Sequence, residues 1–128
     1  MNRNKFIEIL NILQGFKSAV KNCHWAETSS SNKHKILDDI YYELDRYSDA
    51  FAEEGSMCYG LIKHGEIKPV EVKYFDGSEL VGTISKFAIK VRELLKKTED
   101  KVFLSGLCSL TDEFVHAIHI SHYRYKMN

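Results

Sequence analysis

Four long stretches of this chain place hydrophobic residues at helical spacing, and this periodicity restricts the fold more than any other feature. In the first stretch, about residues 4–27, apolar residues recur at intervals of three and four, as they do along one face of a helix. The second covers about residues 33–59, with Ser31 or Asn32 as the expected N-cap. The short hydroxyl-rich segment between them competes for backbone hydrogen bonds and should end the first helix.

Two further helices are expected after a long connection. The third covers about residues 78–98 and begins at Asp76 or Ser78, and the fourth covers about residues 100–126. The residues expected to face the core are, helix by helix, Phe6, Ile9, Leu10, Leu13, Phe16 and Val20; Ile36, Leu37, Ile40, Leu44, Tyr47 and Phe51; Leu80, Ile84, Phe87, Val91 and Leu94; and Phe103, Leu107, Leu110, Phe114 and Ile118.

Four amphipathic helices with one long link in the middle predict an all-α, ferritin-like four-helix bundle that occupies residues 1–128 as a single domain. The two short links make helices one and two antiparallel, and likewise three and four. The link between helices two and three, residues 60–77, contains Pro69 and the β-leaning run VEVKYF. We expect it to wrap one side or end of the bundle. An all-α module of different handedness is the alternative.

The composition limits the partners. Eighteen basic and eighteen acidic residues cancel, so strong nucleic-acid binding is not expected. Three cysteines without CxxC spacing indicate reduced, buried thiols rather than a disulfide or zinc framework. No stretch approaches the roughly 20 apolar residues of a membrane span. The first residues lack the pattern of a signal peptide, so a cytoplasmic location is expected.

One face of the second helix is predominantly acidic. At about 100° per residue, His34, Asp38, Asp45, Asp49 and Glu53 share the side opposite the apolar stripe. A solvated helix face is the simpler interpretation. A solvated face usually mixes charges of both signs, however, and acids stacked in this way repel one another unless a cation or a partner lies beside them.

The spacing along this face suggests a metal site made from two chains. His34 lies one helical turn before Asp38, and Asp49 lies one turn before Glu53, so each pair can bind one cation. Asp38 and Glu53 are about 22 Å apart along the axis, too far for a single ion. An antiparallel two-fold dimer would join the two pairs. The short link after the first helix brings His24 close to His34, although a histidine bonded to the backbone is the simpler role for His24.

These residues resemble the ferroxidase signature of Dps-like mini-ferritins. The signature stands here as His24-Trp25, then His34 with Asp38 four residues later, then Asp49 with Glu53 four residues later. The resemblance is strongest over residues 21–60, and four helices are compatible with it along the whole chain.

The resemblance implies a ferroxidase, an oxidoreductase acting on ferrous iron. His24, His34 and Asp38 of one subunit, with Asp49 and Glu53 of its two-fold neighbour, would hold one or two irons, or zinc as a substitute. Peroxide or oxygen would be the oxidant, and a twelve-subunit shell would store the mineral product. Trp25 would lie beside the site and intercept stray oxidising equivalents.

A second group of polar residues lies on the fourth helix. Glu113 and His116 have the ExxH spacing of larger di-iron bundles, but those need a second such motif, and the second helix has none. A secondary metal site, a contact surface and a plain polar face all remain open for these residues.

Two functions of different class follow. The first is the iron-binding ferroxidase and storage protein. The second is a non-catalytic oligomeric helical bundle that binds a partner and stores no iron. The ligand constellation favours the first, and the short chain and the short link between His24 and His34 favour the second.

Overall fold

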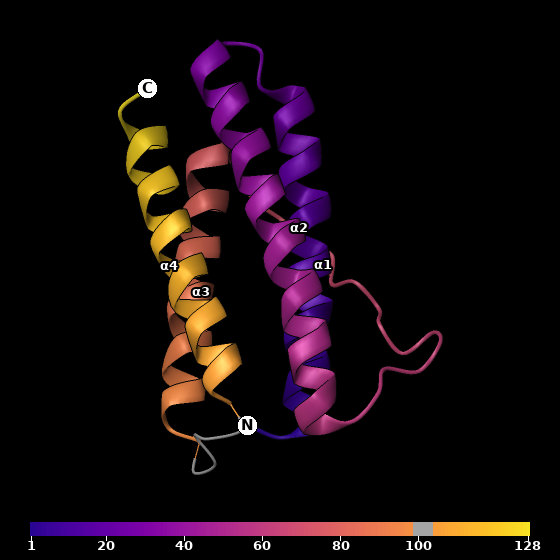
Figure 1. Cartoon of the computed structure of the whole chain (residues 1–128). Coiled ribbons are helices and arrows are strands. Elements are labelled where there is room, and N and C mark those ends of the chain that lie inside the picture. The colour runs from indigo at the N-terminus through magenta and orange to yellow at the C-terminus, as the bar shows by residue number, and fades with distance from the viewer. Residues whose placement is uncertain (99–103) are drawn as a thin grey trace.

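The computed structural model describes residues 1–98 and 104–128 and contains four helices in those ranges. They are α1 (Arg3–Ala26), α2 (Ser31–Tyr59), α3 (Gly77–Lys96) and α4 (Ser105–Lys126), and they pack side by side as a bundle (Figure 1). No strand occurs among the described residues, so VEVKYF does not form one. The predicted all-α four-helix bundle is confirmed.

The helix boundaries agree with the predicted ones to within a few residues. The N-cap of α2 is Ser30, one residue before the earlier of the two predicted caps, and its hydroxyl accepts a hydrogen bond from the Lys33 amide at 3.2 Å. Asp76 caps α3, as predicted, by accepting from the Glu79 amide at 2.9 Å. The fourth helix is described from Ser105 onward, so the predicted start near residue 100 and the predicted core residue 103 lie outside the described residues.

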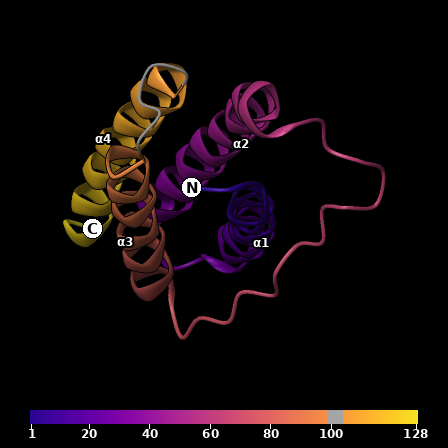
Figure 2. The ribbon, with the colours of Figure 1, turned by 90° about the horizontal axis from the view of Figure 1, so that it is seen from below.

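The connection between α2 and α3 returns the chain along the bundle. α1 and α4 run in one direction, whereas α2 and α3 run in the other (Figure 1). Seen along the axis, each helix has two antiparallel neighbours, and residues 60–76 pass around the outside of α1 (Figure 2). The expectation that this segment wraps one side of the bundle is confirmed.

Specific contacts hold the connection against α1. Near the start of the connection, the two terminal nitrogens of the Arg3 guanidinium donate to the two carboxylate oxygens of Glu66. In its middle, the amide of Val70 donates to the carbonyl of Asn11 at 3.0 Å. A side chain at Gly15 would collide with the Val70 carbonyl oxygen, so only glycine lets the connection lie this close.

The core is formed by the predicted apolar stripes. All six predicted residues of α1 and all six of α2 are buried. In α3 and α4, three predicted residues are only half-buried and pack at the margin of the core: Phe87, Leu94 and Leu110. Within the described residues, no helix has the length and apolar character needed to cross a membrane.

Candidate metal centre

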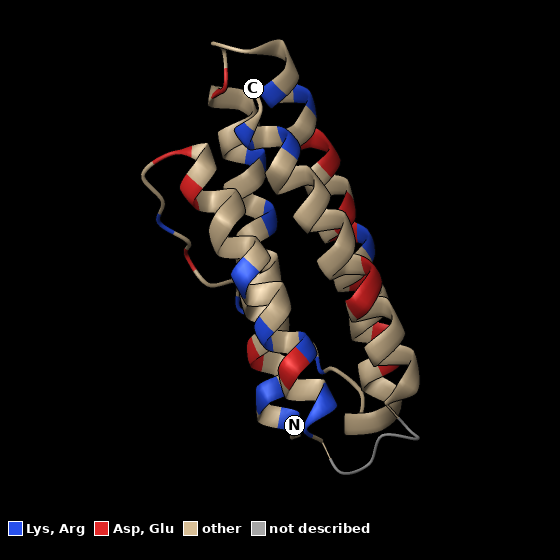
Figure 3. Cartoon of the chain, turned by 90° about the vertical axis from the view of Figure 1, so that its left-hand side faces the viewer, with Lys and Arg blue, Asp and Glu red and all other residues tan. Residues whose placement is uncertain are grey.

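The acidic stripe of α2 lies on the outside of the bundle. All five residues predicted for this face are exposed: His34, Asp38, Asp45, Asp49 and Glu53. The helix as a whole carries seven acidic and three basic residues, and Figure 3 shows Asp and Glu gathered along one long edge of the molecule. The predicted orientation of the stripe is therefore correct, since its carboxylates can reach a cation or a second chain.

The turn between α1 and α2 brings the two histidines together. The imidazole rings of His24 and His34 are stacked, with centroids 3.8 Å apart and an interplanar angle of 29°. The turn that places them is braced by Glu27, whose carboxylate accepts bonds from the Ser29 amide at 3.1 Å and the Ser29 hydroxyl at 2.5 Å. The Ser29 hydroxyl bond is the main reason that the pKa of Glu27 is lowered. The short turn between α1 and α2 is thus enough to bring the His24 and His34 rings into contact.

A hydrogen bond determines the tautomer of His24. Its Nδ1 lies 2.9 Å from the backbone carbonyl oxygen of His34. A carbonyl can only accept, so Nδ1 carries the proton, and in neutral His24 the lone pair is on Nε2. A ring held through one N–H by a carbonyl is the usual arrangement of a metal-binding histidine. Nε2 of His24 is therefore the nitrogen available to an ion.

For both histidines to bind one ion, one of the two stacked rings must turn. An imidazole lone pair lies in the plane of its ring, so two stacked rings do not direct both lone pairs at one ion. His34 is exposed, and its ring can turn about the side-chain bonds without displacing core residues. Asp38, one turn farther along α2, is exposed on the same side. A half-site made of His24, His34 and Asp38 therefore requires the His34 ring to turn out of its stacked position.

No group of three His, Cys, Asp or Glu side chains within the described ranges, 1–98 and 104–128, has the geometry to hold an ion by itself. Asp49 and Glu53 lie at the far end of the α2 face from His34. A site that uses all five residues therefore requires donors from a second chain.

The middle of the acidic stripe has a cation that the sequence pattern did not suggest. Lys17 of α1 forms an ion pair with Asp45 at 2.8 Å, and its side chain is only 18% exposed. The helical wheel of α2 could not show this pair, because it contains no residues of α1. A helical wheel of α1 gives the direction of the Lys17 side chain. Only the packing of α1 against α2 brings that side chain to Asp45.

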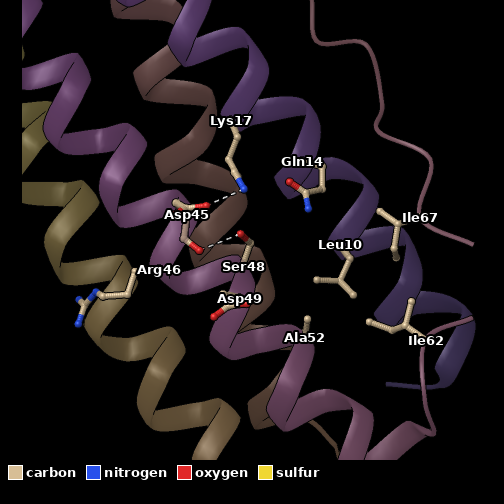
Figure 4. A pocket seen from close by; sticks show the side chains of 10 residues that line it. All are labelled: Leu10, Gln14, Lys17, Asp45, Arg46, Ser48, Asp49, Ala52, Ile62 and Ile67. Atoms are coloured by element: carbon tan, nitrogen blue, oxygen red, sulfur yellow. Dashed lines mark hydrogen bonds and ion pairs between the residues drawn. The ribbon is translucent and has the colours of Figure 1, made fainter. Parts of the chain in front are cut away.

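The ion pair stands at the edge of an open groove between α1, α2 and the connection. The groove has a volume of about 520 Å³ and is lined by Leu10, Gln14, Lys17, Asp45, Arg46, Ser48, Asp49, Ala52, Ile62 and Ile67 (Figure 4). Asp49, one helical turn after Asp45, also lines this groove. Asp45 is neutralised within its own chain by Lys17.

Trp25, the residue after His24 in α1, lies on the surface. Its side chain is 65% exposed, and the ammonium of Lys21 lies 6.0 Å from its ring centroid. The same ammonium lies 4.6 Å above the ring of Tyr41. Trp25, Lys21 and Tyr41 therefore form a surface that is both aromatic and cationic.

The polar residues of α4 are exposed on another part of the surface. Glu113 and His116 both face outward, and the charge of Glu113 contributes to raising the pKa of Arg46 in α2, after the larger effect of Glu43. Neither residue belongs to a group of metal-binding geometry in the described part of the chain. The contact-surface and polar-face interpretations both fit their placement.

Comparison with protein-family models, with curated proteins and with solved structures finds no match to this chain.

Proposed function

We propose that this chain binds ferrous iron at a site shared by two subunits and oxidises it with peroxide or oxygen. Iron is the substrate in this proposal. His24, His34 and Asp38 of one subunit would supply one half of the site, and Asp49 and Glu53 of its two-fold neighbour the other. The observation that carries the proposal is the pairing of the two imidazoles, with His24 held by its Nδ1 proton on the His34 carbonyl.

The donor set suits this substrate. Imidazole nitrogens with carboxylate oxygens and open positions are typical ligands of ferrous iron in oxidising centres, and zinc accepts the same donors. The carboxylates would supply negative charge that favours the ferric product, while the bonded His24 ring would keep its ligand nitrogen oriented. All the carboxylates involved are exposed, so binding need not overcome burial of an unpaired charge.

The course of the chain supports a ferritin-like version of the bundle. A long connection that returns along the bundle, so that the helices before and after it run parallel, is the arrangement described for ferritin-like folds. The resemblance of the ligand motif to Dps-like mini-ferritins extends the proposal to iron storage in a closed shell of twelve subunits. The particle mass in solution tests that extension separately from the chemistry.

Ferrous titration tests the proposal. Under anaerobic conditions the protein should bind ferrous iron, and addition of peroxide should then give ferric absorbance faster than in buffer alone. Asp49→Asn with Glu53→Gln should abolish the rapid phase, because both ligands from one subunit are lost. The matched control is Asp39→Asn with Glu43→Gln, which removes the same charge at the same spacing from other positions of α2. Equal rapid oxidation by all three proteins would refute the ferroxidase.

Mixing variants tests the shared site. His34→Ala alone should lack rapid oxidation, since its histidine half-site is damaged. A co-refolded mixture of His34→Ala with the Asp49→Asn, Glu53→Gln variant should recover part of the activity, because some mixed dimers join two intact halves. If mixing is shown by mass and no activity returns, the shared arrangement of the two halves is refuted.

One observation favours the second candidate function, a non-catalytic oligomeric bundle. Lys17 already neutralises Asp45, so part of the acidic stripe serves the packing of α1 on α2. If the stripe has only this structural role and a role in contacts between chains, iron would bind weakly and without accelerated oxidation, whereas the oligomer would persist in metal-free buffer.

A further inference from the structure

The outer face of α4 has acidic residues near its start and basic residues near its end. Asp112 and Glu113 precede an exposed middle section, and Arg124 and Lys126 follow it; all four are exposed. In the middle section Ile120 is 42% exposed. This face belongs to neither the histidine half-site nor the carboxylate half-site.

The spacing of these charges is self-complementary in an antiparallel pair of α4 helices. About a two-fold axis, each residue lies opposite the one at an equal distance on the other side of the centre. The midpoint of Glu113 and Arg124 falls between residues 118 and 119, and that of Asp112 and Lys126 falls at residue 119. The two midpoints lie only half a residue apart, so a single axis near residue 119 would create both sets of contacts together.

The angular positions agree with the same arrangement. At 100° per residue, Asp112 and Lys126 lie within about 40° of each other around α4, and Glu113 and Arg124 lie within about 20°. The second pair flanks the side toward α2, where Arg46 lies near Glu113. In an antiparallel two-fold pair the same flanks of the two helices meet, so acid would face base on both flanks.

The residues between the charges match one another as well. His116 and Tyr123, which is 63% exposed, have their midpoint between residues 119 and 120. A two-fold axis there places the Tyr123 ring against His116 of the partner subunit. It also places Ile120 near the axis, opposite Ile120 of the partner subunit. The centre of the contact would then be aromatic and apolar, with the charges at its rim.

We propose that α4 is a second docking surface whose partner is α4 of another copy of this chain, antiparallel about a two-fold axis near residue 119. The equal and mirrored distribution of acids and bases favours a second copy over an acidic partner or an anionic membrane, either of which would select a basic surface. This contact goes beyond the proposed iron site and does not depend on it. A chain with this interface and the one on α2 could assemble beyond a dimer.

The interface should be weak on its own. One helix face from each chain is at the low end of the areas found in specific complexes, so association is expected at high protein concentration. Exposed ion pairs each contribute little, but their signs determine which register is favoured. Oligomeric mass alone would not separate this contact from a dimer through α2, so the test requires a probe located on α4.

A cysteine at the expected axis provides that probe. In the full chain, Ile120→Cys should form a disulfide-linked dimer under mild oxidation by diamide, at a yield well above the wild-type baseline from the native cysteines. Lys90→Cys, exposed on α3 and away from this face, is the matched control and should stay at that baseline. If Ile120→Cys shows no excess over the control at about 1 mM protein, the proposal is overturned.

Charge reversal then tests the register. In the Ile120→Cys protein, Glu113→Arg should slow cross-linking at least about tenfold, because two attractive contacts become repulsive. Arg124→Glu should do the same, which provides a second variant if the first fails to fold. The two reversals together should restore the rate, because each new charge again faces its opposite. Cross-linking that is unaffected by either reversal, or that the combined variant does not recover, would refute this register.

Discussion

At the scale of single residues, helical spacing predicts both the buried residues of α1 and α2 and the exposed residues of the acidic stripe. His34, Asp38, Asp49 and Glu53 could be assigned to an exposed face because helical spacing alone determines which side chains share a side. The short link between α1 and α2 predicted that His24 lies near His34, but it did not predict that the two rings stack. The partner of Asp45 could not be predicted, because a contact between helices depends on how α1 and α2 pack.

The core contains a polar contact that the hydrophobic pattern does not reveal. The Tyr47 hydroxyl lies 2.7 Å from the Thr111 hydroxyl, and the two residues are 4% and 0% exposed. The Tyr47 ring also stacks on Phe114, with centroids 4.1 Å apart. Burial raises the pKa of Tyr47 above its usual range, an effect that the Thr111 bond only partly offsets. The hydroxyl therefore stays protonated and depends on one partner.

Thr111→Val should destabilise the fold by about 1–3 kcal/mol, because it leaves the buried Tyr47 hydroxyl without an acceptor or donor. Tyr47→Phe should cost less, since Thr111 can bond a carbonyl of its own helix. The combined variant should lie close to Tyr47→Phe rather than at the sum of the two changes. Urea denaturation followed by circular dichroism gives the free energies, and strict additivity would show that the hydroxyls do not interact.

At the scale of elements, the helices follow from local pattern and the connection does not. Apolar spacing and capping residues such as Asp76 predict where helices form and begin. The path of residues 60–76 depends instead on contacts far apart in sequence, including Val70 on Asn11 and Glu66 on Arg3. Among the described residues no strand is available for the β-leaning residues of this segment to pair with, so they form no sheet.

Gly15→Ala should destabilise the fold by about 1–3 kcal/mol, although alanine is ordinarily the better helix residue. The added methyl group would collide with the Val70 carbonyl oxygen and push the connection off α1. Gly82→Ala in α3 is the matched control: its methyl group would meet only the His122 ring, at 3.5 Å. That control should stabilise by about 0.5–1 kcal/mol. Thermal melting of both variants tests this prediction. Equal shifts in melting temperature of the same sign would contradict the close packing of the connection against α1.

The Arg3–Glu66 pair should make docking of the connection depend on pH. Bonds from Arg3, and then from the Lys63 amide, lower the pKa of Glu66 from 4.5 to about 2. A carboxyl with a lowered folded pKa stabilises the protein above its unfolded pKa, and that contribution fades as the pH falls from 4.5 toward 2. Wild type should therefore be more stable than Glu66→Gln at pH 6, and the difference should shrink by pH 3.

Urea unfolding at pH 6 and pH 3 measures this difference. Glu8→Gln is the control, because the Glu8 carboxylate pairs with Lys5 at 3.4 Å on the exposed side of α1 and does not touch the connection. A wild-type advantage over Glu66→Gln that is equal at the two pH values would show that the ionised pair does not stabilise the fold.

At the scale of the whole molecule, charge is segregated although the net charge is zero. α2 carries seven acidic and three basic residues, whereas α1 carries four basic residues and one acidic residue. The two helices pack against each other, so part of this opposition is satisfied within the chain, as the Lys17–Asp45 pair demonstrates.

Duplex DNA should bind no more tightly than about 10 µM at 150 mM salt, because few phosphates can be neutralised at once. The net charge is zero, and the bases of α1 lie beside the acids of α2. Fluorescence anisotropy with a labelled duplex at several salt concentrations tests this expectation. Submicromolar affinity that falls steeply with added salt would contradict it.

The sequence alone determined the number of helices, their approximate limits and the residues on each face, because all three depend on interactions within a few residues along the chain. It also determined that the His34 and Glu53 ends of one α2 face are too far apart to share an ion. Tertiary structure decided the rest: the course of the connection, the Lys17–Asp45 pair and the stacked position of His24. Each depends on which helix surfaces come together, and this is settled by packing of the complete core rather than by any local pattern.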